Sequence, residues 1–95
     1  MRSEFTLSAD EPCVQGHFPG MPLAPGAWLL GRIERTLLAE HPQSQLQSFK
    51  KVKFLSPLRP GELAQMHVDE SAWPRIKVRI SGPDGDVLQA TALMV

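Results

Sequence analysis

Residues 15–30 read QGHFPGMPLAPGAWLL, and this stretch decides how the rest of the sequence is interpreted. It holds three prolines and three glycines around one histidine, His17, and it ends where a helical pattern begins. Proline fixes φ and removes a backbone donor, so the loop over residues 10–25, with four prolines, is predicted to be stiff. The sequence therefore holds one imidazole in a stiff loop directly ahead of a helix.

One helix is predicted over residues 27–41. Its apolar residues recur at helical spacing, and Pro42 ends the run. The residues that line one side of this helix are Leu29, Leu30, Ile33 and Leu37.

Five segments of the chain are predicted as strands. Residues 4–9 alternate Phe5, Leu7 and Ala9 with polar residues, which is the period of a half-buried strand. Four further strands are predicted after the helix, over residues 46–56, 62–71, 73–80 and 86–95. This order of one strand, a long loop, one helix and a run of strands predicts an α+β fold, with the helix against an antiparallel sheet. We expect a single domain over residues 1–95.

The size and charge of the chain exclude several classes of protein. A chain of 95 residues buries only about 60–65% of its unfolded surface, so we expect a dimer or a larger assembly. Ten basic and ten acidic residues give a net charge of zero, which argues against a nucleic-acid-binding or polybasic membrane protein. A local cationic surface is still predicted, from Lys50, Lys51, Lys53, Arg75, Lys77 and Arg79.

Cysteine and histidine usage argues against a disulfide framework and a metal site. Cys13 is the one cysteine, and the three histidines lack ligand spacing with each other or with it. No segment approaches the roughly 20 apolar residues that cross a bilayer, so a cytoplasmic location is expected.

The segment GHFPGMPLAPG (16–26), with a helix directly after it, resembles the His-Phe-Pro-Gly loop of the beta-hydroxyacyl-ACP dehydratases. VKFLSPLRPGE (52–62) and VLQATALMV (87–95) resemble later strands of the same family. The short length and the opening SADEPCVQGHFPG are most similar to the branch found with aryl-polyene or xanthomonadin-type pigments. The resemblance implies a hotdog fold, in which an antiparallel sheet of about five strands wraps around one central helix.

The same resemblance implies reversible loss of water from a 3-hydroxyacyl thioester to give a trans-2-enoyl thioester. His17 matches the histidine that removes the C2 proton, and imidazole suits this role because it titrates near neutrality. Gly26 matches the glycine whose amide meets the thioester oxygen, at a helix N-terminus with unpaired N–H groups. The acyl group is implied to arrive on the phosphopantetheine arm of acyl carrier protein, without a further cofactor. The substrate-binding residues expected around it are Phe18, Pro19, Gly20, Leu23, Pro25, Trp28, Leu30 and Gly31.

The chain departs from the family pattern at one catalytic position. Dehydratases of this kind carry Glu or Asp five residues after the Pro-Gly glycine, and this chain has Gly31 there. Glu34 lies one turn further along, about 60° around the helix. Either Glu34 replaces the missing acid or an acid arrives from another subunit, while an exposed Glu34 that pairs with a neighbouring arginine is the simpler interpretation of that residue.

Two other functions therefore stay open beside the dehydratase. Gly31 favours a catalytically weakened subunit that binds acyl carrier protein or completes a hetero-oligomer with an active dehydratase. A hotdog thioesterase shares the oxyanion site at the helix end, although the HFPG loop argues against it.

Overall fold

The computed structural model describes residues 1–8 and 26–95. The predicted site residues His17, Phe18, Pro19, Gly20, Leu23 and Pro25 lie outside the described residues, as does Cys13. The described elements, in chain order, are β1 (Arg2–Thr6), α1 (Gly26–Glu40), β2 (Leu46–Phe54), β3 (Leu63–Ala72), β4 (Arg75–Gly82) and β5 (Gly85–Met94).

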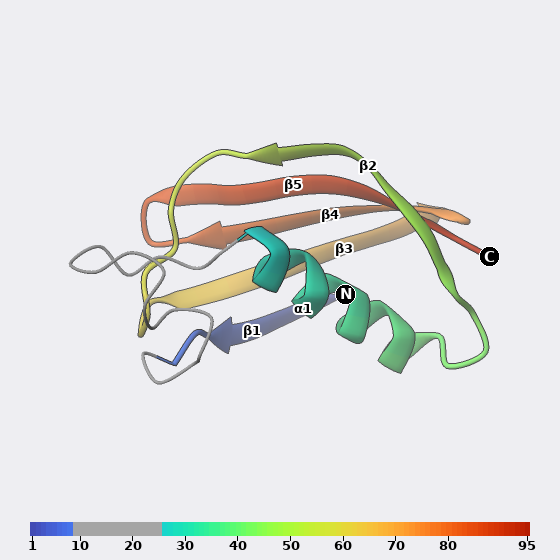
Figure 1. The fold of residues 1–95 in the computed structure, drawn as a ribbon, viewed down its shortest axis with the longest axis horizontal. Helices are drawn as coiled ribbons and strands as arrows, with labels where there is room; N and C mark the ends of the chain where they lie inside the picture. The colour runs from blue at the N-terminus through green and yellow to red at the C-terminus, as the bar shows by residue number, and fades with distance from the viewer. Residues whose placement is uncertain (9–25) are drawn as a thin grey trace.

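The five strands form one antiparallel sheet in the order β1-β3-β4-β5-β2. The helix α1 lies across one face of this sheet, and the sheet curves around it (Figure 1). This arrangement of one helix within a five-stranded antiparallel sheet confirms the predicted α+β hotdog architecture. Within the described ranges no helix is long and apolar enough to cross a membrane.

The core lies between α1 and the inner face of the sheet. Leu29, Ile33 and Leu37 are spaced four residues apart, and all three are buried. Residues at i and i+4 lie on one helix face, so this spacing turns a single apolar stripe toward the sheet. The strands supply the other side of the core through alternate buried residues, among them Met66, Val68, Ile76, Val78, Ile80 and Leu88.

The C-terminal end of the helix is tied to the β3–β4 hairpin. Nε2 of His41 lies 3.0 Å from Oε1 of Glu70, and its ring lies 4.7 Å from that of Trp73, centroid to centroid. The amide of His41 donates to the carbonyl of Leu37 at 2.9 Å, which completes the last turn. This end of α1 is therefore held by polar and aromatic contacts outside the apolar stripe.

The predicted segments are correct in type, and several boundaries differ. The first strand begins at Arg2 rather than at residue 4, because the N-terminal ammonium and the carbonyl of Met1 both bond to Val68 and extend the pairing with β3. Residues 73 and 74 were predicted as strand but form the turn between β3 and β4. There the amide of Trp73 donates to the carbonyl of Glu70, and Pro74 has no amide to donate.

Candidate active site

A cavity of about 440 Å³ opens at the N-terminus of α1. The first amides of a helix have no partner within it and carry its positive dipole end, so they are ready donors for an anionic oxygen. Among the described residues that line the cavity, only Ser56 carries a polar side chain, so this part of the lining is mainly apolar. Its walls are formed by Gly26, Leu29, Phe54, Leu55, Ser56, Pro57, Leu58 and Val87.

Phe54, the last residue of β2, covers Gly26. A Cβ atom built on Gly26 would lie 2.7 Å from Cζ and 2.8 Å from Cε1 of Phe54, closer than real Cβ atoms approach other atoms. Glycine is therefore the residue that lets this aromatic ring lie over the helix start. Phe54 is 56% exposed and the adjacent Leu55 is 50% exposed, so two apolar side chains stand at the rim of the cavity.

The segment after β2 is held against β5 by short hydrogen bonds. The amide of Leu55 donates to the carbonyl of Val87 at 2.8 Å, and the hydroxyl of Ser56 donates to the carbonyl of Asp86 at 2.6 Å. Leu58 is 1% exposed and anchors the same segment in the core. This wall of the cavity is therefore built from fixed backbone, in which the Phe54 and Leu55 side chains are the exposed parts.

The other predicted helix residues lie elsewhere on α1. The ring of Trp28 lies 6.0 Å from that of Phe5, so this side chain is directed toward β1. Leu30 packs at the edge of the core. Neither of them, nor Gly31 or Glu34, lines the cavity at the helix start.

Gly31 and Glu34 lie on the side of α1 that faces away from the buried stripe. A Cβ atom on Gly31 would meet, among the described residues, only Nη1 of Arg35 at 3.9 Å, so the helix backbone is open to an approaching group there. Glu34 is exposed and has no ion pair within residues 1–8 and 26–95. The pairing of Glu34 with Arg32 or Arg35, which was the simpler interpretation, is thus not found in the described part of the chain.

A second and larger cavity, of about 760 Å³, lies on the opposite face of the sheet. It contains none of the predicted site residues that the structure describes. We place the candidate active site at the smaller cavity, because the N-terminus of α1 opens into it. Across the described ranges no three His, Cys, Asp or Glu residues are grouped to hold a metal ion.

Sequence reasoning placed Gly26 at the helix start but did not identify the opposing wall as part of the site. Phe54, Leu55, Ser56 and Leu58 come from the segment that was interpreted only as a strand and a turn. One signal was present, because Phe54 and Leu55 are adjacent apolar residues where the alternation of the strand ends. Val87 had no such signal, since a buried strand residue reads as core.

Known proteins resemble this chain over most of its length. The family model described as ApeI-like, ApeI dehydratase, matches residues 1–89. The 3-hydroxyacyl-[acyl-carrier-protein] dehydratase FabZ of Koribacter versatilis is 29% identical over 85 residues, which cover 80% of this chain and 54% of that protein. The chain spans about half the length of the curated relatives it matches.

Solved structures show the same fold. A protein of Erwinia carotovora subsp. atroseptica superposes with a TM-score of 0.86 at 18% identity, covering 99% of this chain and 81% of that one. The dehydratase heterocomplex ApeI:P of Xenorhabdus doucetiae superposes with a TM-score of 0.82 at 25% identity, covering 98% and 84%. With a family model that matches residues 1–89, the chain belongs to the ApeI-like dehydratase family.

Proposed function

We propose that this chain acts as a 3-hydroxyacyl-[acyl-carrier-protein] dehydratase, which converts a 3-hydroxyacyl thioester to the trans-2-enoyl thioester. The observation that carries the proposal is the apolar cavity at the N-terminus of α1, a helix that begins at the last glycine of the HFPG…PG sequence. Membership of a dehydratase family supports it. A neutral chain with one cysteine suits a reducing cytosol, so we place the reaction in the cytoplasm.

In this reaction the imidazole of His17 removes a proton from C2 of the acyl group. The electron pair moves onto the thioester oxygen, which accepts a hydrogen bond from the amide of Gly26 at the positive end of α1. When the pair returns, the C2–C3 double bond forms and the C3–O bond breaks. The departing hydroxyl takes up one proton and leaves as water, so the thioester is neither oxidised nor hydrolysed.

The proton for the departing hydroxyl needs a donor, and position 31 does not provide one. Glu34 is exposed and lies outside the cavity, so in the single chain no described acid reaches the site. We propose that the acid is either Glu34 of a second copy of this chain or a residue of a different subunit. The chain would then act as a homodimer or as a hetero-oligomer, and the similar X. doucetiae structure is of a dehydratase heterocomplex.

A subunit that binds the acyl carrier but catalyses weakly is the second candidate. Gly31 favours it, because the family pattern carries a carboxyl group at this position of the helix. Such a subunit would be active only when its partner supplies the acid.

Replacing Gly31 by Asp is expected to raise the turnover number for enoyl formation by about tenfold or more, because positioned acids contribute about 10²–10⁴-fold. The open backbone at Gly31 leaves room for the side chain, and because Gly31 lies outside the cavity of its own chain, the new carboxyl would act across a subunit boundary. The control is Glu34→Gln in the otherwise natural sequence, measured by steady-state kinetics. Glu34 would be identified as the acid by three results together. The natural enzyme would already turn over rapidly, Gly31→Asp would give no gain, and Glu34→Gln would be inactive.

Replacing Gly26 by Ala is expected to lower kcat/KM by about 10²-fold, the typical loss for one oxyanion donor. The added methyl group would displace the Phe54 ring and occupy the space in which the thioester oxygen meets the amide. Because Phe54 is 56% exposed and free to swing outward, the free energy of unfolding should change little. Since alanine keeps the amide, unimpaired turnover in a folded Gly26→Ala protein would show that the acyl group does not occupy the space beside this amide.

The function is tested by incubating the purified protein with 3-hydroxyacyl-acyl carrier protein, alone and with candidate partner subunits, and by following the products by mass. Enoyl thioester formed by the protein alone supports the dehydratase. Enoyl thioester formed only with a partner supports the weakened subunit. Free acid as the product would contradict both and identify a thioesterase.

A further inference from the structure

The outer face of the sheet, away from α1, carries most of the positive charge of the chain. Cross-strand partners share one face of a sheet, and the pairs His67↔Arg79 and Arg79↔Gln89 continue to Lys53 as one row. A second row runs from Asp69 through Lys77 and Thr91 to Lys50. Seven of the ten basic residues fall on this face: Arg2, Lys50, Lys51, Lys53, Arg75, Lys77 and Arg79.

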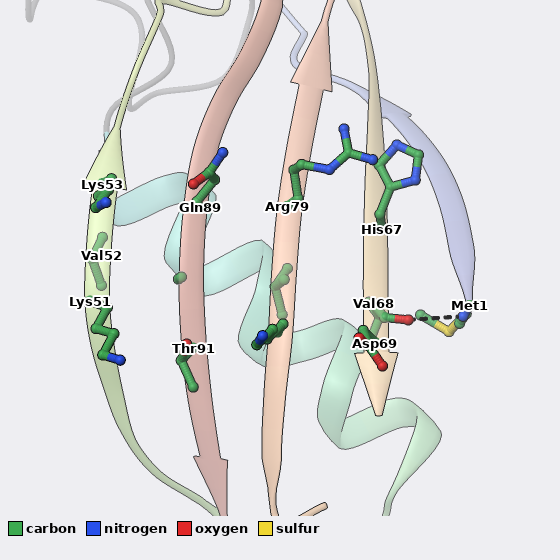
Figure 2. A pocket seen from close by; sticks show the side chains of 13 residues that line it. Met1, Lys51, Val52, Lys53, His67, Val68, Asp69, Arg79, Gln89 and Thr91 are labelled. Carbon is green, nitrogen blue, oxygen red and sulfur yellow. Dashed lines mark hydrogen bonds between the residues drawn. The ribbon is translucent and has the colours of Figure 1, made fainter. Parts of the chain in front are cut away.

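A β-bulge in β2 adds one cation to this face. The pairing with β5 shifts between Lys50 and Lys53, and Lys51 has a φ of 55°. A bulge inserts one extra residue into its strand and redirects the side chains around it. Lys51 and Lys53 therefore both line the outer face (Figure 2), and Val52 between them lines it too while it packs against the core.

Three acidic residues, Glu4, Asp69 and Asp86, lie on this face against seven basic ones, and two of the three are engaged in hydrogen bonds. Asp86 accepts a hydrogen bond from Nη1 of Arg79 at 3.1 Å and another from Gln89. Asp69 accepts two hydrogen bonds from Ser71, from its amide and its hydroxyl, and these bonds lower the pKa of Asp69. Within the described ranges Lys50, Lys51 and Lys53 have no ion pair.

The positive field also acts on the histidine in the first row. Burial, together with the nearby guanidinium groups of Arg79 and Arg2, holds the pKa of His67 below its ordinary value. Nε2 of His67 lies 3.4 Å from the hydroxyl of Ser81, which provides no negative charge. The surface therefore has a surplus of positive charge on a chain whose net charge is zero.

This surface is hollowed rather than flat. The cavity of about 760 Å³ is lined by Met1 and by residues of β2 to β5, among them Lys51, Lys53, His67, Lys77 and Arg79. Figure 2 shows Lys51 and Lys53 on β2 and His67 on β3 at the two sides, with α1 behind the sheet. We call this hollow the cationic groove. It fits a narrow acidic element such as one helix better than an extended planar surface.

We propose that the cationic groove is the docking surface for the acidic acyl carrier protein that delivers the substrate. The inference rests on the proposed function and adds to it the place where the carrier binds. Lys53 lines the groove and Phe54, the next residue of β2, lines the active-site cavity, so the end of β2 is shared by the two. Opposite charges raise the rate of such encounters by about 10–10³-fold at low salt.

Charge reversal at Lys53→Glu and Lys77→Glu tests this surface, and Arg59→Glu is the matched control. All three side chains are exposed and undergo the same change of charge, while Arg59 lies in the turn before β3, outside the groove. Each variant is assayed with carrier-bound substrate and with the same acyl group on N-acetylcysteamine, an uncharged thioester that needs no docking. Binding of holo-acyl carrier protein is measured separately at low and high salt.

We expect Lys53→Glu and Lys77→Glu to lower kcat/KM for the carrier-bound substrate by about tenfold each, with the value for the uncharged thioester unchanged. Arg59→Glu should stay within about twofold on both substrates, and carrier binding to the natural protein should weaken with salt. Equal kcat/KM for carrier-bound substrate in the groove variants and the control would overturn the proposal. The proposal would also be overturned if the charge-reversal variants lost binding to anionic phospholipid vesicles but not to acyl carrier protein, because that result would identify a membrane-binding surface.

The two proposals fail in different ways. If the natural protein, with or without partner subunits, converts neither thioester, the proposed function is wrong, while the binding measurement still decides about the groove. If it converts both and carrier binding is independent of salt and of Lys53 and Lys77, only the docking surface is wrong.

Discussion

Replacement of His17 by Asn should lower the turnover number for enoyl formation by about 10²–10⁴-fold, the usual contribution of a positioned general base. Asparagine has a similar polar shape but cannot take up a proton from C2. The measurement is steady-state turnover of the uncharged acyl thioester.

His67→Asn is the matched control for this experiment. His67 lies on the outer face of the sheet, so its loss should leave turnover of the uncharged thioester within about twofold. Retention of activity in His17→Asn, or an equal fall in both variants, would show that His17 is not the base. If inactive His17→Asn still binds acyl carrier protein, the variant is folded and its loss of activity is due to the lost catalytic group.

Local patterns predicted most of the elements in this fold. The four-residue spacing of Leu29, Ile33 and Leu37 predicted the helix to within one residue at either end. The reason is that the residues that pack on the sheet recur with the period of the helix, and this period is visible in the sequence. The turn at Trp73 and Pro74 was assigned to a strand. Tryptophan favours strands, and the bond from its amide to Glu70 depends on the register of the hairpin.

The candidate site was predicted on one side only. Gly26 follows from the Pro-Gly sequence ahead of the helix, whereas the Phe54 wall depends on where the end of β2 crosses α1. That crossing is a contact between residues 28 positions apart, and no local pattern encodes it. The cationic surface was predicted with Lys51 among its members, but the bulge in β2 beside Lys51 is a feature that alternation along a strand does not indicate.

Replacement of Ile33 by Ala should lower the free energy of unfolding by about 2–5 kcal/mol, the range for removing a buried branched side chain from a core. Ile33 is fully buried in the middle of the apolar stripe, with Leu29 and Leu37 one turn away on either side. Domains of this size are stable by only about 5–15 kcal/mol, so the loss is a large part of the total. Thermal unfolding should shift downward by roughly 10 °C or more.

The comparison with Ile33→Val separates the cavity from the loss of apolar surface. Valine removes one methylene and should cost about 0.5–1.5 kcal/mol, while an exposed substitution on the same helix, Glu34→Gln, should stay within about 0.5 kcal/mol. All variants are compared at one protein concentration, because assembly shifts the apparent stability. A loss below about 1 kcal/mol in Ile33→Ala would mean that α1 is not seated on the sheet through this stripe. The position of the Gly26 amide over the cavity would then lack its support, since the apolar stripe is what holds the start of the helix against Phe54 and Leu58.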